Sequence, residues 1–111
     1  MAFPLEALPD AVLARAQTWA RLGIAWHTRP IKPNHGKPII VSEFESASWL
    51  AVITIWSTGE AELETVRLAD ERVINKHHDL TSTDDLEALL DELVALLIND
   101  RIPEAAVVAH L

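Results

Sequence analysis

The sequence contains no cysteine and no tyrosine, and it has only three glycines. Without cysteine the chain can form no disulfide, and it offers neither a thiolate nucleophile nor the ligands of a cysteine-based zinc or iron–sulfur site. The glycines are too few for a phosphate-binding GxxxxGK[ST] loop, and no serine lies in a GxSxG or SxxK motif. These absences remove the usual signatures of nucleophilic and nucleotide chemistry, and no cofactor is expected.

Positive charge is also scarce, because 9 lysines and arginines oppose 17 aspartates and glutamates and give a formal charge of −8. This excess repels a phosphate backbone, so nucleic acid is not an expected partner. The same charge attracts basic proteins and also keeps a small domain in solution, and charge alone does not separate these roles. The sequence shows no apolar run of ~18 residues and no basic leader followed by an apolar stretch, which predicts a cytoplasmic protein without a membrane partner.

Half of the 111 residues are apolar, which is enough for one core but not for two, so a single domain over residues 1–111 is expected. The first part of the chain predicts a helix that begins near Pro9 or Asp10 and ends at Gly23. Its apolar stripe consists of Val12, Leu13, Ala16, Trp19 and Ala20.

Residues 24–29 are apolar enough either to pack beneath a sheet or to form a short strand, and the prolines of residues 30–38 predict a loop. From Ile39 the apolar period changes to two, which predicts four antiparallel strands. They cover residues 39–47, 48–56, 60–68 and 73–79. Residues 57–59, Ser-Thr-Gly, suit a type I turn followed by a glycine bulge.

A second helix is predicted after Ser82, which forms a possible capping box with Asp85. Its apolar positions have helical spacing and are Leu86, Leu89, Leu90, Leu93, Val94 and Leu97. Residues 104–111 are expected to form a short terminal helix or a frayed tail. The predicted fold class is therefore α+β, with an N-terminal helix, a four-stranded antiparallel meander sheet and a C-terminal amphipathic helix in two layers. Neither helix can form a core alone, so both should cover one sheet face and leave the other open.

The adjacent residues His77 and His78 are the most obvious candidates for metal binding, because histidine is a common ligand. Neighbouring side chains on a strand point to opposite faces, so one ion could not easily use both. The other three histidines make no HxH or HxxxH pattern with them. A metal site is therefore not expected.

Carboxylates should line the open face of the predicted sheet. Glu60, Glu62 and Glu64 alternate along one strand, and Glu43 and Glu45 lie two strands away. Acids at positions i, i+2 and i+4 lack the apolar pocket that separates two pKa values for acid–base catalysis. The row is therefore either a solvated surface or a platform for a basic partner.

Two tryptophans, Trp49 and Trp56, bracket the central strand, and their odd spacing places them on opposite faces. Either both belong to the core, or one of them is accessible and anchors an interface among the glutamates. Trp56 is the candidate anchor, because it lies beside the hairpin turn.

The run from Trp49 to Val66, WLAVITIWSTGEAELETV, resembles the signature hairpin of the TriTu-type immunity proteins of bacterial polymorphic-toxin systems. In that family a strand ending in Ile/Val-Thr-X-Trp meets a short turn with glycine and then a strand of alternating acids. The matching residues here are Ile53, Thr54, Trp56, Gly59, Glu62 and Glu64. The resemblance continues through a further strand and an amphipathic helix and covers roughly residues 37–98, whereas the N-terminal third departs from it.

The resemblance implies a non-enzymatic protein that binds and blocks a cognate antibacterial toxin as a heterodimer. The toxin of the family's type member, associated with type VI secretion, is an ADP-ribosyltransferase directed at a translation elongation factor, and a deaminase or nuclease would fit an acidic inhibitor equally. The expected toxin-binding residues are Glu43, Glu45, Trp56, Glu60, Glu62 and Glu64. The alternative is a structural or adaptor protein that self-associates as a homodimer, through a sheet edge or through the apolar residues 105–111.

Overall fold

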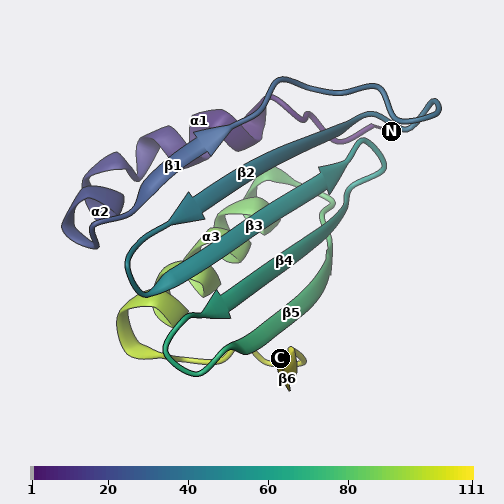
Figure 1. Ribbon diagram of the computed structural model, residues 1–111. Coiled ribbons are helices and arrows are strands. Elements are labelled where there is room, and N and C mark those ends of the chain that lie inside the picture. Colours follow the sequence, from purple (N-terminus) through teal and green to yellow (C-terminus); the bar gives the residue numbers. More distant parts are fainter. Residues whose placement is uncertain (1) are drawn as a thin grey trace.

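The computed structural model describes residues 2–111, which form three helices and a six-stranded antiparallel sheet (Figure 1). The elements are α1 (Ala7–Ala14), α2 (Ala16–Arg21), β1 (Ala25–Thr28), β2 (Ile39–Glu45), β3 (Trp49–Trp56), β4 (Glu60–Arg67), β5 (Arg72–Asp79), α3 (Thr83–Asn99) and β6 (Val107–His110). The strands lie side by side in the order in which they occur in the sequence. The α+β class and the antiparallel meander are therefore confirmed.

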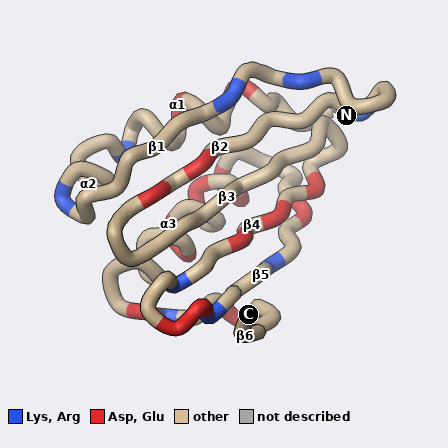
Figure 2. Tube along the Cα trace, viewed as in Figure 1, with Lys and Arg blue, Asp and Glu red and all other residues tan. Residues whose placement is uncertain are grey.

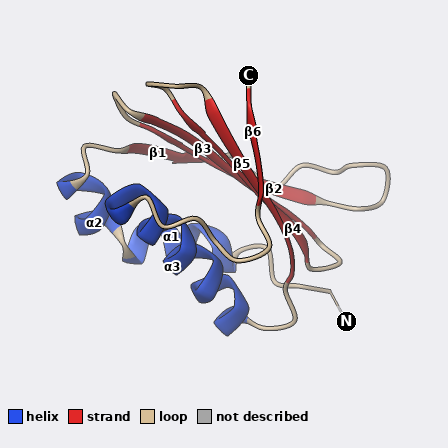
Figure 3. Cartoon of the chain, turned by 90° about the horizontal axis from the view of Figure 1, so that it is seen from below, coloured by secondary structure: helices blue, strands red, loops and turns tan. Residues whose placement is uncertain are grey.

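All three helices pack on one face of the sheet, which confirms the two-layer arrangement (Figure 3). The core lies between the layers. Its helical side combines buried residues of α1 and α2 with five leucines of α3, whose spacing places them on one stripe. These buried leucines are Leu86, Leu89, Leu90, Leu93 and Leu96. None of the helices in the described part of the chain has the length and apolar character that crossing a membrane would require.

The N-terminal helical region begins at Ala7, earlier than predicted, and it is interrupted at Arg15, whose φ and ψ are −103° and 17°. The Val12 carbonyl accepts the Arg15 N–H and also the buried indole N–H of Trp19, at 3.1 and 2.9 Å. The Arg15 guanidinium reaches across to α3 and pairs with Asp91 at 2.9 Å. The apolar spacing could not reveal this break, because buried residues lie on both sides of it, Val12 before and Trp19 after. The predicted stripe is only partly correct, since Leu13 and Ala20 are exposed.

Gly23 ends the helical region as predicted, with φ at 68°. Its N–H bonds the Ala20 carbonyl, and the Ile24 N–H bonds the Trp19 carbonyl, at 3.1 and 2.9 Å. This is a Schellman termination, and glycine suits it because a positive φ costs glycine little. The chain then enters β1, so the strand interpretation of residues 24–29 is the correct one.

The four long strands alternate between core and open face as the period of two predicts. On β3 and β4 the buried residues are Ala51, Ile53, Ile55, Ala61, Leu63 and Thr65. The β3–β4 hairpin closes through Gly59, which has φ at 95° and whose N–H bonds the Trp56 carbonyl at 2.9 Å. This agrees with the expected turn.

The sheet has six strands rather than the predicted four, because both edges gain a short strand. The expectation of a terminal helix or frayed tail is wrong, since Val107–His110 pairs antiparallel with Arg72–Asn75. A four-residue strand shows too little alternation to be recognised locally. It forms because β5 offers an edge whose backbone groups need partners.

The N-terminus of α3 differs in one detail from the predicted capping box. The Ser82 hydroxyl accepts the Asp85 N–H at 3.3 Å, as expected. The Asp85 carboxylate returns to the backbone N–H and hydroxyl of Thr81, each at 2.8 Å, rather than to Ser82. These bonds to the charged form, led by the Thr81 N–H, lower the pKa of Asp85.

Candidate protein-docking surface

The sheet face that the helices leave uncovered, here called the open face, carries all five predicted glutamates. Glu43 pairs in register with Val52, and Val52 with Glu64, while Glu45 pairs with Leu50. Directly opposed residues in an antiparallel pair share one face, so the acids of β2 and β4 flank β3 on the same side. Figure 2 shows the two acidic strands on either side of an uncharged β3.

Three of these carboxylates already have basic partners within the protein, two of them cations and one a histidine. Arg29 donates two hydrogen bonds to Glu43 at 2.8 and 3.1 Å, and Lys37 contacts Glu60 at 3.1 Å. Glu62 lies 2.7 Å from a ring nitrogen of His77 on β5. The Arg29 contact lowers the pKa of Glu43 through its hydrogen bonds to the ionised form. These acids are held in place by the protein itself.

Glu45 and Glu64 differ from the other three. Both side chains are exposed, and within residues 2–111 neither carboxylate makes a hydrogen bond or an ion pair. An unpaired surface carboxylate can accept a cation from another molecule without first breaking an internal contact. These two residues are therefore the acids of the open face that can pair with an external cation at the lowest energetic cost.

Trp56 lies on the open face, opposite Ile39 of β2, and is half-buried. The Lys37 ammonium lies 6.0 Å from the centroid of its ring, at the outer limit of a cation–π contact. Trp49 has the opposite orientation, as the odd spacing predicted. Trp56 thus lies at one end of the open face, beside the hairpin turn and Glu60.

The other end of the open face is apolar. Leu50 of β3 pairs with Val66 of β4, which in turn pairs with Val73 of β5. Leu50 is 40% exposed, although it is a large aliphatic residue. An apolar strip next to unpaired carboxylates combines the two components of a protein interface, an apolar centre and a charged rim.

His77 lies between two carboxylates on β5 and β4. One ring nitrogen contacts Glu62 at 2.7 Å and the other contacts Asp79 at 3.0 Å. Both contacts favour the protonated ring, and the pKa of His77 is raised, mainly by Glu62 and then by Asp79. His78 points to the helix side, where it contacts Glu92 at 3.2 Å. The two histidines therefore diverge, and residues 2–111 contain no cluster of three or more potential metal ligands.

The raised pKa of His77 predicts a measurable pH dependence. Protonated His77 stabilises the folded state below the ordinary histidine pKa, and this stabilisation is lost as the pH rises through the higher value of the folded protein. In an NMR titration, Glu62→Gln should lower the His77 midpoint, and Asp79→Asn should lower it less, because Glu62 is the larger cause. A His77 midpoint that is the same in the parent protein and in Glu62→Gln would contradict this assignment.

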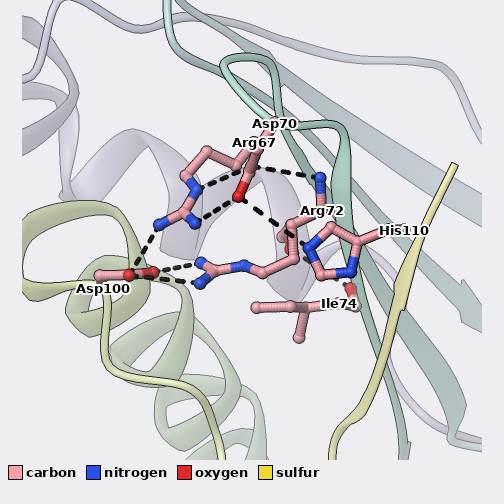
Figure 4. Close-up of polar contacts among 7 residues, drawn as sticks. Arg67, Asp70, Arg72, Ile74, Asp100 and His110 are labelled. Atoms are coloured by element: carbon pink, nitrogen blue, oxygen red, sulfur yellow. Dashed lines mark hydrogen bonds and ion pairs between the residues drawn. The ribbon is translucent and has the colours of Figure 1, made fainter.

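A second charged cluster joins the end of α3 to the β4–β5 turn (Figure 4). Arg72, which is buried, and Arg67 both pair with Asp100, and Arg67 also pairs with Asp70 at 2.6 Å. The hydrogen bonds from Arg67 hold the pKa of Asp70 well below its usual range. His110 of β6 lies 4.0 Å from Asp70. This cluster fixes the place where the chain leaves α3 and returns to the sheet as β6.

Sequence reasoning identified the glutamates but missed their partners. Arg29, Lys37 and His77 each contact one of these acids, and only the tertiary structure brings them together. The apolar end of the open face was also missed. A signal for it exists in the sequence, because Leu50 and Val52 fall on the same face as Glu43 and Glu45 once β2 and β3 are paired.

The model of one protein family, described as immunity protein TriTu, matches residues 8–96. The match extends further toward the N-terminus than the resemblance seen in the sequence and includes α2 and all of α1 except Ala7. A comparison with curated proteins finds no match.

Proposed function

Because the chain belongs to the TriTu family of immunity proteins, we propose that its open face binds a basic surface of a cognate toxin and thereby closes the toxin's active site. Immunity proteins neutralise a cognate toxin by binding it, and the family is not enzymatic. The observation that carries the proposal is the position of the five glutamates. All of them lie on the sheet face that no helix covers, where a partner can reach them together.

Electrostatics supports a basic partner. The formal charge of −8, to which the five glutamates of the open face contribute, would accelerate encounter with a cationic surface, and this acceleration should decline as salt is added. Trp56 and the apolar strip around Leu50 would supply the desolvated contacts that slow dissociation. Inhibition would be steric, with the site of action in the cytoplasm.

We extend the proposal to the class of toxin. An enzyme that binds a dinucleotide or a nucleic acid needs a cationic cleft for phosphate groups, and such a cleft complements the open face. An ADP-ribosyltransferase, which the family resemblance implies, and a deaminase or nuclease all have this electrostatic requirement. Assaying the toxin domain encoded beside this reading frame would decide among them.

Charge reversal tests the docking surface directly. In the variant Glu60→Lys, Glu62→Lys, Glu64→Lys, the open face would repel a basic partner, so affinity for the catalytically inactivated toxin domain should fall at least about 100-fold. Binding would be measured by biolayer interferometry, and protection by growth of cells that express the active toxin. Circular dichroism would show whether the variant remains folded.

The matched control reverses three exposed acids away from the open face: Glu6, Asp10 and Glu104. Each substitution adds two positive charges, so both triple variants change the formal charge from −8 to −2. The control should lose less than about 10-fold in affinity, because it changes the overall field but no docking contact. Equal losses in the two triple variants would remove the open face from the proposal.

A further inference from the structure

The strand β6 has an unusual surface for the edge of a sheet. All four of its residues are exposed. Val107 and Val108 are 67% and 44% exposed, and the following residue, Leu111, is 82% exposed. Leu111 and Val107 are the two most exposed large apolar residues in the described chain. A short edge strand thus presents its apolar side chains to solvent.

The outer backbone groups of β6 can be assigned from its pairing with β5. The Leu111 N–H bonds the Glu71 carbonyl at 3.1 Å, so the backbone groups of Leu111 face β5. Orientation alternates along an antiparallel strand, and the register pairs Ala109 with Val73 and Val107 with Asn75. The N–H and C=O groups of Val108 and His110 therefore point outward, away from the sheet. They are free to pair with another strand.

Native sheets usually protect such an edge with lysine, inward-pointing charges or proline. The sequence Val-Val-Ala-His of β6 contains none of these residues. The acidic and basic side chains that give the net charge of −8 all lie outside β6. A second strand could therefore approach β6 without meeting a charged side chain on the strand itself.

We propose that β6 is a self-association site, at which the β6 strands of two copies of this chain pair antiparallel across a two-fold axis at Ala109. In this register Val108 pairs with His110 of the second copy, and both have outward backbone groups, so two hydrogen-bonded pairs form. Val107 meets Leu111 of the second copy in a pair without backbone hydrogen bonds, where side chains approach most closely. The two sheets become one continuous sheet.

The sequence of the segment favours a second copy as the occupant. A two-fold interface must be complementary to itself. The axis at Ala109 places the smallest side chain at the centre and joins the two most exposed apolar residues, Val107 and Leu111, on either side of it. The contact is small, so association should be reversible and weak. Salt should strengthen it, because screening reduces the repulsion between two acidic molecules.

This association is distinguishable from toxin docking. Binding of a basic toxin to the open face should weaken with salt, whereas pairing of two β6 strands should strengthen. Sedimentation equilibrium of the protein alone, from about 10 μM to about 1 mM, covers the range expected for small interfaces. The expected result is an average mass that rises with concentration and rises further at high salt. A monomer mass throughout would overturn the proposal.

Three variants test the register. Val108→Pro removes an outward N–H while leaving the bonds to β5, so it should abolish association. Val107→Lys with Leu111→Lys should also abolish it, because lysines then meet across the axis. Val107→Lys with Leu111→Glu places opposite charges there and should restore association, now weakened by salt. Circular dichroism would verify that each variant is folded.

The paired design separates register from general charge. The double lysine variant has a formal charge of −6, and the lysine–glutamate variant keeps −8. General repulsion would therefore favour association of the former, and only pairing of position 107 with position 111 favours the latter. Association that survives both Val108→Pro and the double lysine variant would exclude β6 as the contact.

Discussion

A variant in which Glu45 and Glu64 are both replaced by glutamine is expected to dissociate from its toxin about 10- to 100-fold faster than the parent protein. The two carboxylates have no partner among residues 2–111 and are exposed. A charge-assisted hydrogen bond contributes about 1 kcal/mol more than the neutral bond that glutamine can still form, so the two substitutions together should cost about 2 kcal/mol, and no internal contact has to be broken to form these bonds. The apolar strip around Leu50 and Val52 would exclude water from both contacts.

The control for this experiment is the variant Glu43→Gln, Glu60→Gln. Like the Glu45→Gln, Glu64→Gln variant, it removes two negative charges from the open face. The association rate constants of the two double variants should therefore fall by similar factors. The dissociation rate of the control should change little, because Arg29 and Lys37 already occupy these carboxylates. Surface plasmon resonance at two salt concentrations would measure both constants. If both double variants dissociate at the same rate, the distinction between paired and unpaired glutamates has no functional meaning.

Gly59→Ala is expected to lower the free energy of unfolding by about 3 kcal/mol or more. Gly59 adopts φ at 95°, where a side chain is strained, and a Cβ atom would lie 2.3 Å from the backbone oxygen of Leu80. The Leu80 N–H bonds the Gly59 carbonyl at 2.8 Å. The two backbone segments therefore cannot separate to admit a methyl group without losing this hydrogen bond.

Gly36→Ala provides the matched control, because Gly36 also has a positive φ, 83°, but a Cβ atom there would meet nothing within 4 Å. Only the conformational strain remains, which costs about 1 kcal/mol. Urea denaturation followed by tryptophan fluorescence would give both values. Equal destabilisation would show that the contact with Leu80 has no energetic effect. Because Gly59 lies in the turn between Trp56 and Glu60, Gly59→Ala should also weaken toxin binding.

Local patterns in the sequence predicted most of the fold. The leucine repeat of α3 and the alternation of β3 and β4 are long enough to specify an element without information from elsewhere in the chain. For β1 the sequence left a strand and a packed segment as alternatives, and β6 was not predicted at all. In both cases four residues contain too little periodicity. The division at Arg15 was missed for a related reason, since the contacts that maintain it involve the distant residue Asp91 and the indole of Trp19.

The sequence by itself determined that this chain is acidic, that it lacks the motifs of catalysis, and that Glu43, Glu45, Glu60, Glu62 and Glu64 can share one face of a sheet. It could do so because a strand places alternate residues on one side. Only the tertiary structure decided which acids remain available. Arg29 and Lys37 are 14 and 23 residues from the glutamates they pair with. Strand register, which depends on the whole core, brings them together and leaves Glu45 and Glu64 without a partner among residues 2–111.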